Sequence, residues 1–100
     1  MDDAGIPALI DAIRHLHGCE ATHVETVKVR EMHEGAVVWD GEVEVFNLVG
    51  HPKASRVYAW SHATTGAKRR FVAVLHVPPV NSPLAAVQAA IVAEVKAAQN

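Results

Sequence analysis

The chain has a single cysteine, few aromatic residues and no long apolar segment, and each shortage narrows the class of protein. Cys19 alone cannot form a disulfide within the chain, and this favours a reducing compartment. Asp2 and Asp3 stand where a signal peptide carries basic residues, and no apolar run is long enough to span a bilayer. We therefore expect one domain over residues 1–100 in a cytoplasmic protein with no membrane partner.

Acidic residues are absent from a long central stretch of the chain, Val45 to Ala93. From Met1 to Glu44 there are ten acidic and three basic residues, whereas Val45 to Ala93 has five basic residues and no acidic one. Two oppositely charged hairpins would neutralise each other if they pair in one sheet. The alternative is that the basic half meets an anion or the acidic half of a second subunit. The formal net charge of −2 lacks the basic excess of nucleic-acid binders and argues against a nucleic-acid partner.

Two helices are expected at the ends of the chain. Residues 7–17 begin with a proline and are followed by Gly18, and their apolar residues recur at helical spacing. Asn81-Ser82-Pro83 supplies an N-cap hydroxyl and a first-turn proline for a second helix that continues to the tail. The predicted core-facing residues are Ile6, Leu9, Ile10, Ile13 and Leu16 in the first helix and Leu84, Val87, Ile91 and Val95 in the second.

A first hairpin is expected after the first helix. The segments Thr22–Met32 and Ala36–Val49 alternate apolar and polar residues around a turn at residues 33–35. The apolar residues of the second segment change parity, which indicates a bulge or twist near residues 45–46. Asp40-Gly41 is either a competing hairpin turn or a bulge.

A second hairpin, apolar on both faces, is the most informative feature of the sequence. Its strands, Ala54–His62 and Arg69–Val77, flank a loop that contains Gly66, and apolar residues alternate with other apolar residues. A two-residue turn at Thr65-Gly66 would place Trp60 opposite Phe71, and a shift of one residue would exchange the partners. In that first register one face carries Val57, Ala59, Val72 and Val74.

These elements predict an α+β domain in the order α-β-β-β-β-α, with a four-stranded antiparallel sheet packed by the two terminal helices. Two short helices are expected to cover one face of the sheet, so the other apolar face would need a partner. We therefore predict a homodimer formed through the second hairpin, with the interface residues Val57, Ala59, Val72, Val74 and His76. The alternative is a curved sheet wrapped around the first helix, with a pocket lined by Trp39, Phe46, Tyr58, Trp60 and Phe71.

The sequence carries no catalytic signature. Four potential metal ligands lie close together, but their spacing lacks the paired cysteines of structural zinc sites. They are His15, His17, Cys19 and His23. Cys19 next to a histidine has the composition of an activated thiol, yet a lone cysteine in a small domain is typically a buried apolar residue. We expect no metal, no cofactor and no catalytic residue.

Three functional hypotheses follow. The first is a non-enzymatic binding or interaction module that takes a second copy of the chain or a small planar or anionic ligand. Its candidate ligand-binding residues are Trp39, Phe46, Arg56, Tyr58, Trp60, His62 and Phe71, although the strand aromatics are also typical of core packing. The second is a small enzyme with an aromatic pocket and His62 or His76 as general acid or base. The third is nucleic-acid binding along an edge formed by Arg56, Lys68, Arg69 and Arg70.

Overall fold

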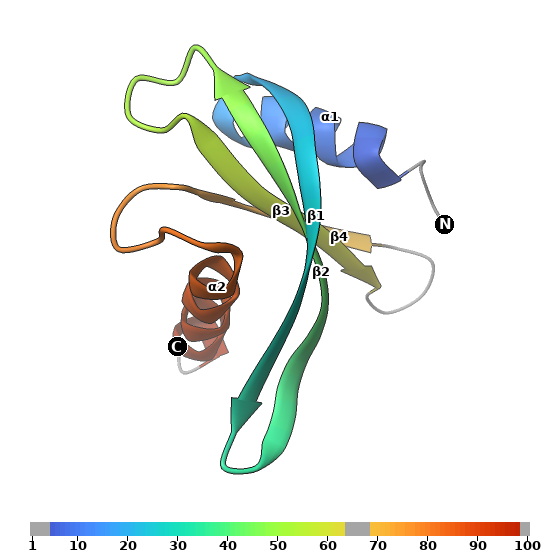
Figure 1. Ribbon diagram of the computed structural model, residues 1–100, viewed down its shortest axis with the longest axis vertical. Helices are drawn as coiled ribbons and strands as arrows, with labels where there is room; N and C mark the ends of the chain where they lie inside the picture. The colour runs from blue at the N-terminus through green and yellow to red at the C-terminus, as the bar shows by residue number, and fades with distance from the viewer. Residues whose placement is uncertain (1–4, 64–68, 99–100) are drawn as a thin grey trace.

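The computed structural model describes residues 5–63 and 69–98 (Figure 1). Four strands form one antiparallel sheet in the order β1-β2-β3-β4, with one helix before it and one after it. The predicted α+β fold with the order α-β-β-β-β-α is confirmed, while the turn expected at Thr65-Gly66 lies outside the described residues. The elements are α1 Gly5–His17, β1 Glu20–His33, β2 Ala36–Val49, β3 Arg56–Ala63, β4 Arg69–Leu75 and α2 Pro83–Ala98.

Local signals set the helix ends as the sequence indicates. Gly18 follows α1 with a φ of +69°, and its N–H donates to the carbonyl oxygen of Arg14 at 2.8 Å, which closes the last turn. At the start of α2 the Ser82 hydroxyl accepts a hydrogen bond from the amide of Ala85 at 3.1 Å. No helix in the described part of the chain is long and apolar enough to cross a membrane.

The first hairpin turns at Glu34 and Gly35, which have φ angles of 51° and 81°. Two successive positive φ values are typical of the two-residue turns that match the twist of the flanking strands. Asp40 and Gly41 lie within β2 and pair with β1, so a competing hairpin at these residues is wrong. The turn expected at residues 33–35 is confirmed.

The change of parity in β2 arises without a break in its pairing with β3. Val45 and Phe46 pair with consecutive residues of β3, and the irregularity nearest to them is an extra residue of β1, Val24, between the partners His23 and Glu25. The odd-numbered residues Trp39, Val43 and Val45 pack on the face that α2 covers. The even-numbered residues Phe46 and Leu48, which follow them, pack on the face that α1 covers. The parity changes because successive parts of the strand pack in different cores, first the core under α2 and then the core under α1.

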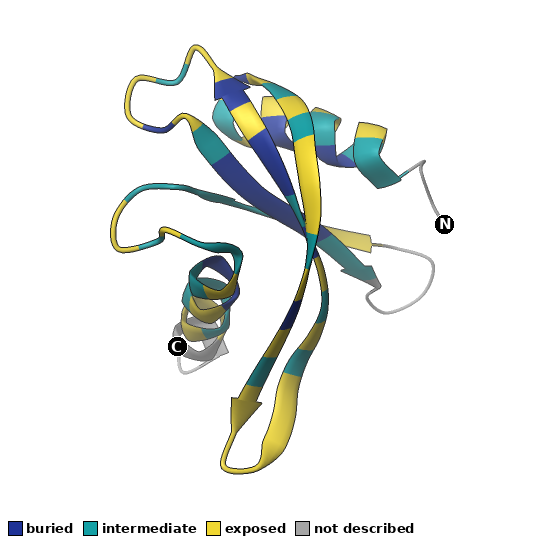
Figure 2. Cartoon of the chain, in the orientation of Figure 1, coloured by how far each residue is buried: buried dark blue, intermediate teal, exposed yellow. Residues whose placement is uncertain are grey.

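The two helices lie on opposite faces of the sheet (Figure 1). The expectation that together they cover one face is therefore wrong, and both apolar faces of the second hairpin are covered within the chain. Figure 2 shows the buried residues concentrated where the strands cross between the helices. The core under α1 contains Leu9, Ile13, Cys19, Phe46, Leu48, Ala54, Val57 and Ala59. The core under α2 contains Val29, Val43, Val45, Tyr58, Trp60, Ala86 and Val87.

The second hairpin pairs one residue away from the register expected for a turn at residues 65–66. Trp60 pairs with Val72 instead of Phe71, and Ala63 pairs with Arg69. Directly paired residues share a face, so Val72 and Val74 lie with Tyr58 and Trp60 on the α2 face. Val57 and Ala59 lie on the α1 face with Ala73 and Leu75. The row of residues predicted as one interface is therefore divided between two faces.

Each helix buries a narrower stripe than its sequence pattern predicts. Leu16 at the end of α1 is 55% exposed, and Leu84 at the start of α2 is 41% exposed. In α2 the buried positions are Ala86 and Val87, with Ala90 partly buried behind them. The sheet-facing surface of α2 is therefore made largely of small side chains.

Candidate functional site

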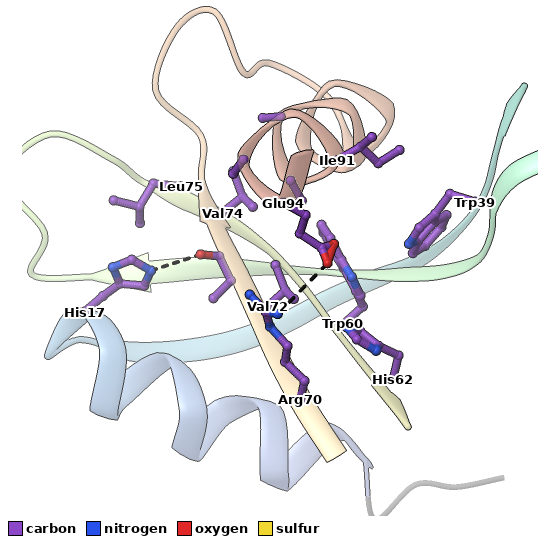
Figure 3. Close-up of a pocket in the computed structure, with 14 residues that line it drawn as sticks. His17, Trp39, Trp60, His62, Arg70, Val72, Val74, Leu75, Ile91 and Glu94 are labelled. Atoms are coloured by element: carbon purple, nitrogen blue, oxygen red, sulfur yellow. Dashed lines mark hydrogen bonds and ion pairs between the residues drawn. The ribbon is translucent and has the colours of Figure 1, made fainter. Parts of the chain in front are cut away.

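A groove of about 600 Å³ opens between α2 and the strands β3 and β4 (Figure 3). Sites for small molecules commonly enclose about 300–1,000 Å³. The apolar side chains around the groove come from β2, β3, β4 and α2. They include Trp39, Trp60, Val72, Val74 and Ile91.

Both tryptophans of the chain line this groove. Their ring centroids lie 5.6 Å apart at an interplanar angle of 71°, an edge-to-face arrangement. Trp60 is only 4% exposed and belongs to the core under α2. The Trp39 ring lies against Gly41, where an added Cβ would stand 3.2 Å from the indole Cη2. The missing side chain at Gly41 thus leaves room for the Trp39 ring.

The α2 side of the groove is lined mainly by alanines, Ala89, Ala90 and Ala93. Alanine is the strongest helix former, so this segment stays helical without large side chains. Methyl groups do not reach across the space that separates the helix from β4. The space remains because these residues maintain the helix and do not fill the gap.

Charged and polar side chains stand at the rim. Arg70 and Glu94 form an ion pair at 4.0 Å across the mouth, where both side chains are more than half exposed (Figure 3). His62 also lines the groove, one residue pair from the end of β3. Exposed ion pairs contribute little to stability, so the Arg70 guanidinium can exchange Glu94 for another acidic group at small cost.

His17 joins the rim from the last turn of α1. Its Nε2 donates to the carbonyl oxygen of Ala73 at 3.2 Å (Figure 3). The N–H of His76 donates to the carbonyl oxygen of Arg56. Because backbone hydrogen bonds alternate along an antiparallel strand, the even-numbered residues of β4 form the hydrogen bonds to β3. The carbonyl group of the odd-numbered Ala73 therefore points to the open edge of the sheet. His17 thereby ties α1 to the outer strand beside the groove.

The residues predicted to bind a ligand are separated by the sheet. Trp39, Trp60 and His62 line the groove. Phe46 is buried under α1, and Phe71 lies on the α1 face in a shallow hollow beside Leu16. The pocket expected inside a sheet wrapped around the first helix is therefore not formed, because its aromatic residues lie on both faces.

Tyr58 and Arg56 complete the predicted set and lie outside the groove. Tyr58 is 2% exposed, so its ring packs in the core and offers no surface for stacking from solvent. Arg56 lines a separate hollow near His76. Tyr58 and Trp60 are therefore core residues under α2, and Arg56 does not border the groove that Trp60 lines.

The predicted interface residues also have different surroundings. Val57 and Ala59 are fully buried under α1, and Val72 and Val74 line the groove. His76 accompanies Arg56 in the separate hollow. These five residues form no common surface on which a second chain could lie.

The histidines and the cysteine near the end of α1 do not converge on a metal. Cys19 is buried and its thiol donates to the carbonyl oxygen of His17 at 3.4 Å. His23 bonds Glu44, with Nε2 and Oε1 2.7 Å apart. The described residues contain no group of three or more side chains placed to hold a metal ion.

The basic edge predicted for nucleic acid is not continuous in the described residues. Arg69 donates to the hydroxyl of Ser61, whereas Arg70 pairs with Glu94 on the other face. Arg56 lies at the far end of β3, and Lys68 lies outside the described residues.

The groove also contains residues that the sequence did not single out as ligand contacts. They include His17, Ala73 and Leu75, and Ala89, Ala90, Ile91, Ala93 and Glu94 of α2. The alanine-rich composition of the last helix was the available signal, since small side chains either permit close packing or leave space. Comparisons with protein-family models, curated proteins and solved structures found no match to this chain.

Proposed function

We propose that this protein is a small non-enzymatic binding module whose groove takes a mainly apolar molecule with an aromatic ring and an acidic group. The observation that carries the proposal is the edge-to-face pair of Trp39 and Trp60 in a groove of about 600 Å³. Such a groove combines an apolar lining with a few polar groups at its edge, which is the usual composition of a small-molecule site.

The lining supports an aromatic ligand. The partly buried Trp39 presents an indole ring that packs edge-to-face on the buried Trp60, and Val72 and Val74 extend the apolar surface along β4. A planar ligand would gain both apolar burial and favourable edge or face contacts with the indoles. The flat alanine surface of α2 would lie against its opposite side.

The rim supports an acidic substituent. Arg70, His17 and His62 are potential donors or cations there, and Glu94 is the one carboxylate among the described residues that line the groove. A guanidinium binds a carboxylate or sulfonate with two parallel hydrogen bonds. Such an acid would compete with Glu94 for Arg70, whose present ion pair is long and exposed.

Binding is proposed in preference to catalysis because apolar side chains form the body of the groove and the histidines stand at its rim. Self-association stays a prediction. An uncovered apolar face was the reason to expect it, and α2 covers that face within the chain. Sedimentation of the wild-type chain and of Val74→Glu tests whether a dimer forms through the groove residues.

The binding experiment uses two fluorescent probes of similar shape, the anionic anilinonaphthalene sulfonate and the neutral N-phenylnaphthylamine. Both probes should bind and quench the emission of Trp39 and Trp60, the two tryptophans of the chain. Arg70→Gln should weaken the sulfonate about tenfold, equivalent to about 1.4 kcal/mol, and leave the neutral probe unchanged. Arg69→Gln is the matched control, because it removes the neighbouring charge from the other face.

A steric pair of variants locates the bound probe. Ala93→Phe places a ring at the mouth of the groove and should reduce the affinity for both probes. Val92→Phe changes the adjacent residue of α2, which is 52% exposed and does not line the groove, and should leave binding intact. Equal affinity in the two variants, with unchanged circular dichroism, would place the probes elsewhere and refute the proposal.

A further inference from the structure

A second, polar hollow lies outside the groove, where the ends of β2, β3 and β4 meet. Its volume is about 390 Å³, and it is lined by Asn47, Leu48, Ser55, Arg56 and His76. Backbone hydrogen bonds hold its walls together. The N–H of Leu48 donates to the carbonyl oxygen of Ser55, and the N–H of His76 donates to that of Arg56, both at 2.9 Å.

The polar side chains that line this hollow are donors or cations. Asn47 has an amide, Ser55 a hydroxyl, Arg56 a guanidinium and His76 an imidazole, and none of the carboxylates that the structure describes lines the hollow. Among the described residues, no acidic side chain forms an ion pair with Arg56. A cation and several donors without an acidic partner are the composition of an anion site.

Tyr58 orients the histidine of this hollow. Its hydroxyl oxygen lies 2.6 Å from His76 Nδ1, and the two rings are tilted by 45° at a centroid distance of 5.8 Å. Burial raises the pKa of Tyr58, partly offset by Arg56, so the hydroxyl keeps its proton near neutral pH. The bond occupies Nδ1 and leaves Nε2 as the ring nitrogen available to a ligand.

We propose that this hollow binds a small oxyanion between the Arg56 guanidinium and the Nε2–H of protonated His76, with Asn47 and Ser55 as neutral donors. In the protonated ring Nδ1–H donates to the Tyr58 oxygen and Nε2–H donates to the anion. The hydrogen bond to Tyr58 thus orients the imidazole so that its other nitrogen can bind the anion. The site is separate from the groove, whose lining ends at Leu75.

Charged groups near His76 determine how anion binding is linked to pH. Arg56 from β3 lines the same hollow, and a bound anion would neutralise its guanidinium. Glu25 from β1 acts electrostatically on Tyr58 and opposes the anion from that side. By linkage, an anion that binds protonated His76 about tenfold more tightly raises its titration midpoint by about one pH unit.

The test follows the histidine side chains by NMR as pH is varied in sodium sulfate or in sodium chloride of the same ionic strength. Sulfate does not titrate in this range, so any shift belongs to the protein. Sulfate should raise the midpoint of His76 and leave that of His51 unchanged. The Nδ1 atom of His51 is held by the amides of Lys53 and Ala54 outside the hollow.

Matched variants separate a site from general charge screening. Arg56→Gln should abolish the sulfate-dependent shift of His76, whereas Arg69→Gln, which removes a charge elsewhere, should preserve it. Tyr58→Phe should reduce the shift with the fold retained. The same His76 midpoint in sulfate and chloride, or an intact shift in Arg56→Gln, would overturn the proposal. Acetate in place of sulfate distinguishes a carboxylate from a tetrahedral anion as the preferred ligand.

Discussion

Replacement of Trp60 by alanine is the most direct test of how the core and the groove are connected. Trp60 is 4% exposed, pairs with Val72 across the second hairpin and packs edge-to-face on Trp39. Removal of a buried tryptophan side chain typically costs about 3–5 kcal/mol. One side of this residue borders the groove, so water can enter the vacated space and the cavity penalty is small. We expect a loss of about 3 kcal/mol, at the lower end of this range.

Such a loss should lower the midpoint of thermal unfolding by about 12–24 °C in a domain of this size. Urea unfolding followed by far-ultraviolet circular dichroism is the appropriate assay, because the substitution removes one of the two tryptophan fluorophores. Phe71→Ala is the control, since Phe71 is 36% exposed on the other face and should cost less. A loss below about 1 kcal/mol for Trp60→Ala, with an unchanged m-value, would show that Trp60 is not part of the core.

Three further predictions concern the residues that position the groove. Ser82→Ala removes the N-cap of α2 and should cost about 1 kcal/mol in urea unfolding, whereas Ser82→Asn should retain most of that stability. Gly41→Ala should displace the Trp39 ring and change the near-ultraviolet circular dichroism of the tryptophan pair, and an unchanged spectrum would contradict the close contact. The guanidinium of Arg14 lowers the pKa of Glu20 by hydrogen bonding. The pair therefore stabilises the fold above the ordinary pKa of a glutamate, and this contribution is lost as pH falls through the lowered value. Arg14→Gln should return the Glu20 pKa to its ordinary value in a carboxyl NMR titration.

The order of elements could be predicted because the local signals agree. Gly18 and Ser82 mark helix ends by chemistry that needs no partner, and the turn at Glu34 and Gly35 depends on a local backbone conformation. The placement of the two helices on opposite faces of the sheet could not be predicted from the sequence. Apolar residues on both faces of the second hairpin correctly indicated that both faces are buried, but the pattern does not say which element provides the cover.

The predicted register of the second hairpin was wrong for a related physical reason. A slip of one residue is normally excluded because it exposes apolar side chains and buries polar ones. Here either register keeps apolar residues on both faces, so the sequence pattern does not distinguish Phe71 from Val72 as the partner of Trp60. The groove was missed on its α2 side because Leu84, which the expected stripe placed toward the core, is exposed, and alanines that were not in that stripe line the groove.

The contact between His17 and β4 also affects how this chain behaves at high concentration. β4 is an outer strand, and unpaired carbonyl and amide groups on such strands are templates for aggregation and amyloid growth. His17 occupies the carbonyl oxygen of Ala73, and the N–H of Val77 occupies that of Leu75 at 2.9 Å. An incoming strand thus finds two consecutive acceptors along this edge already taken. The His17 imidazole, which borders the groove, therefore also hinders the pairing of another strand with β4.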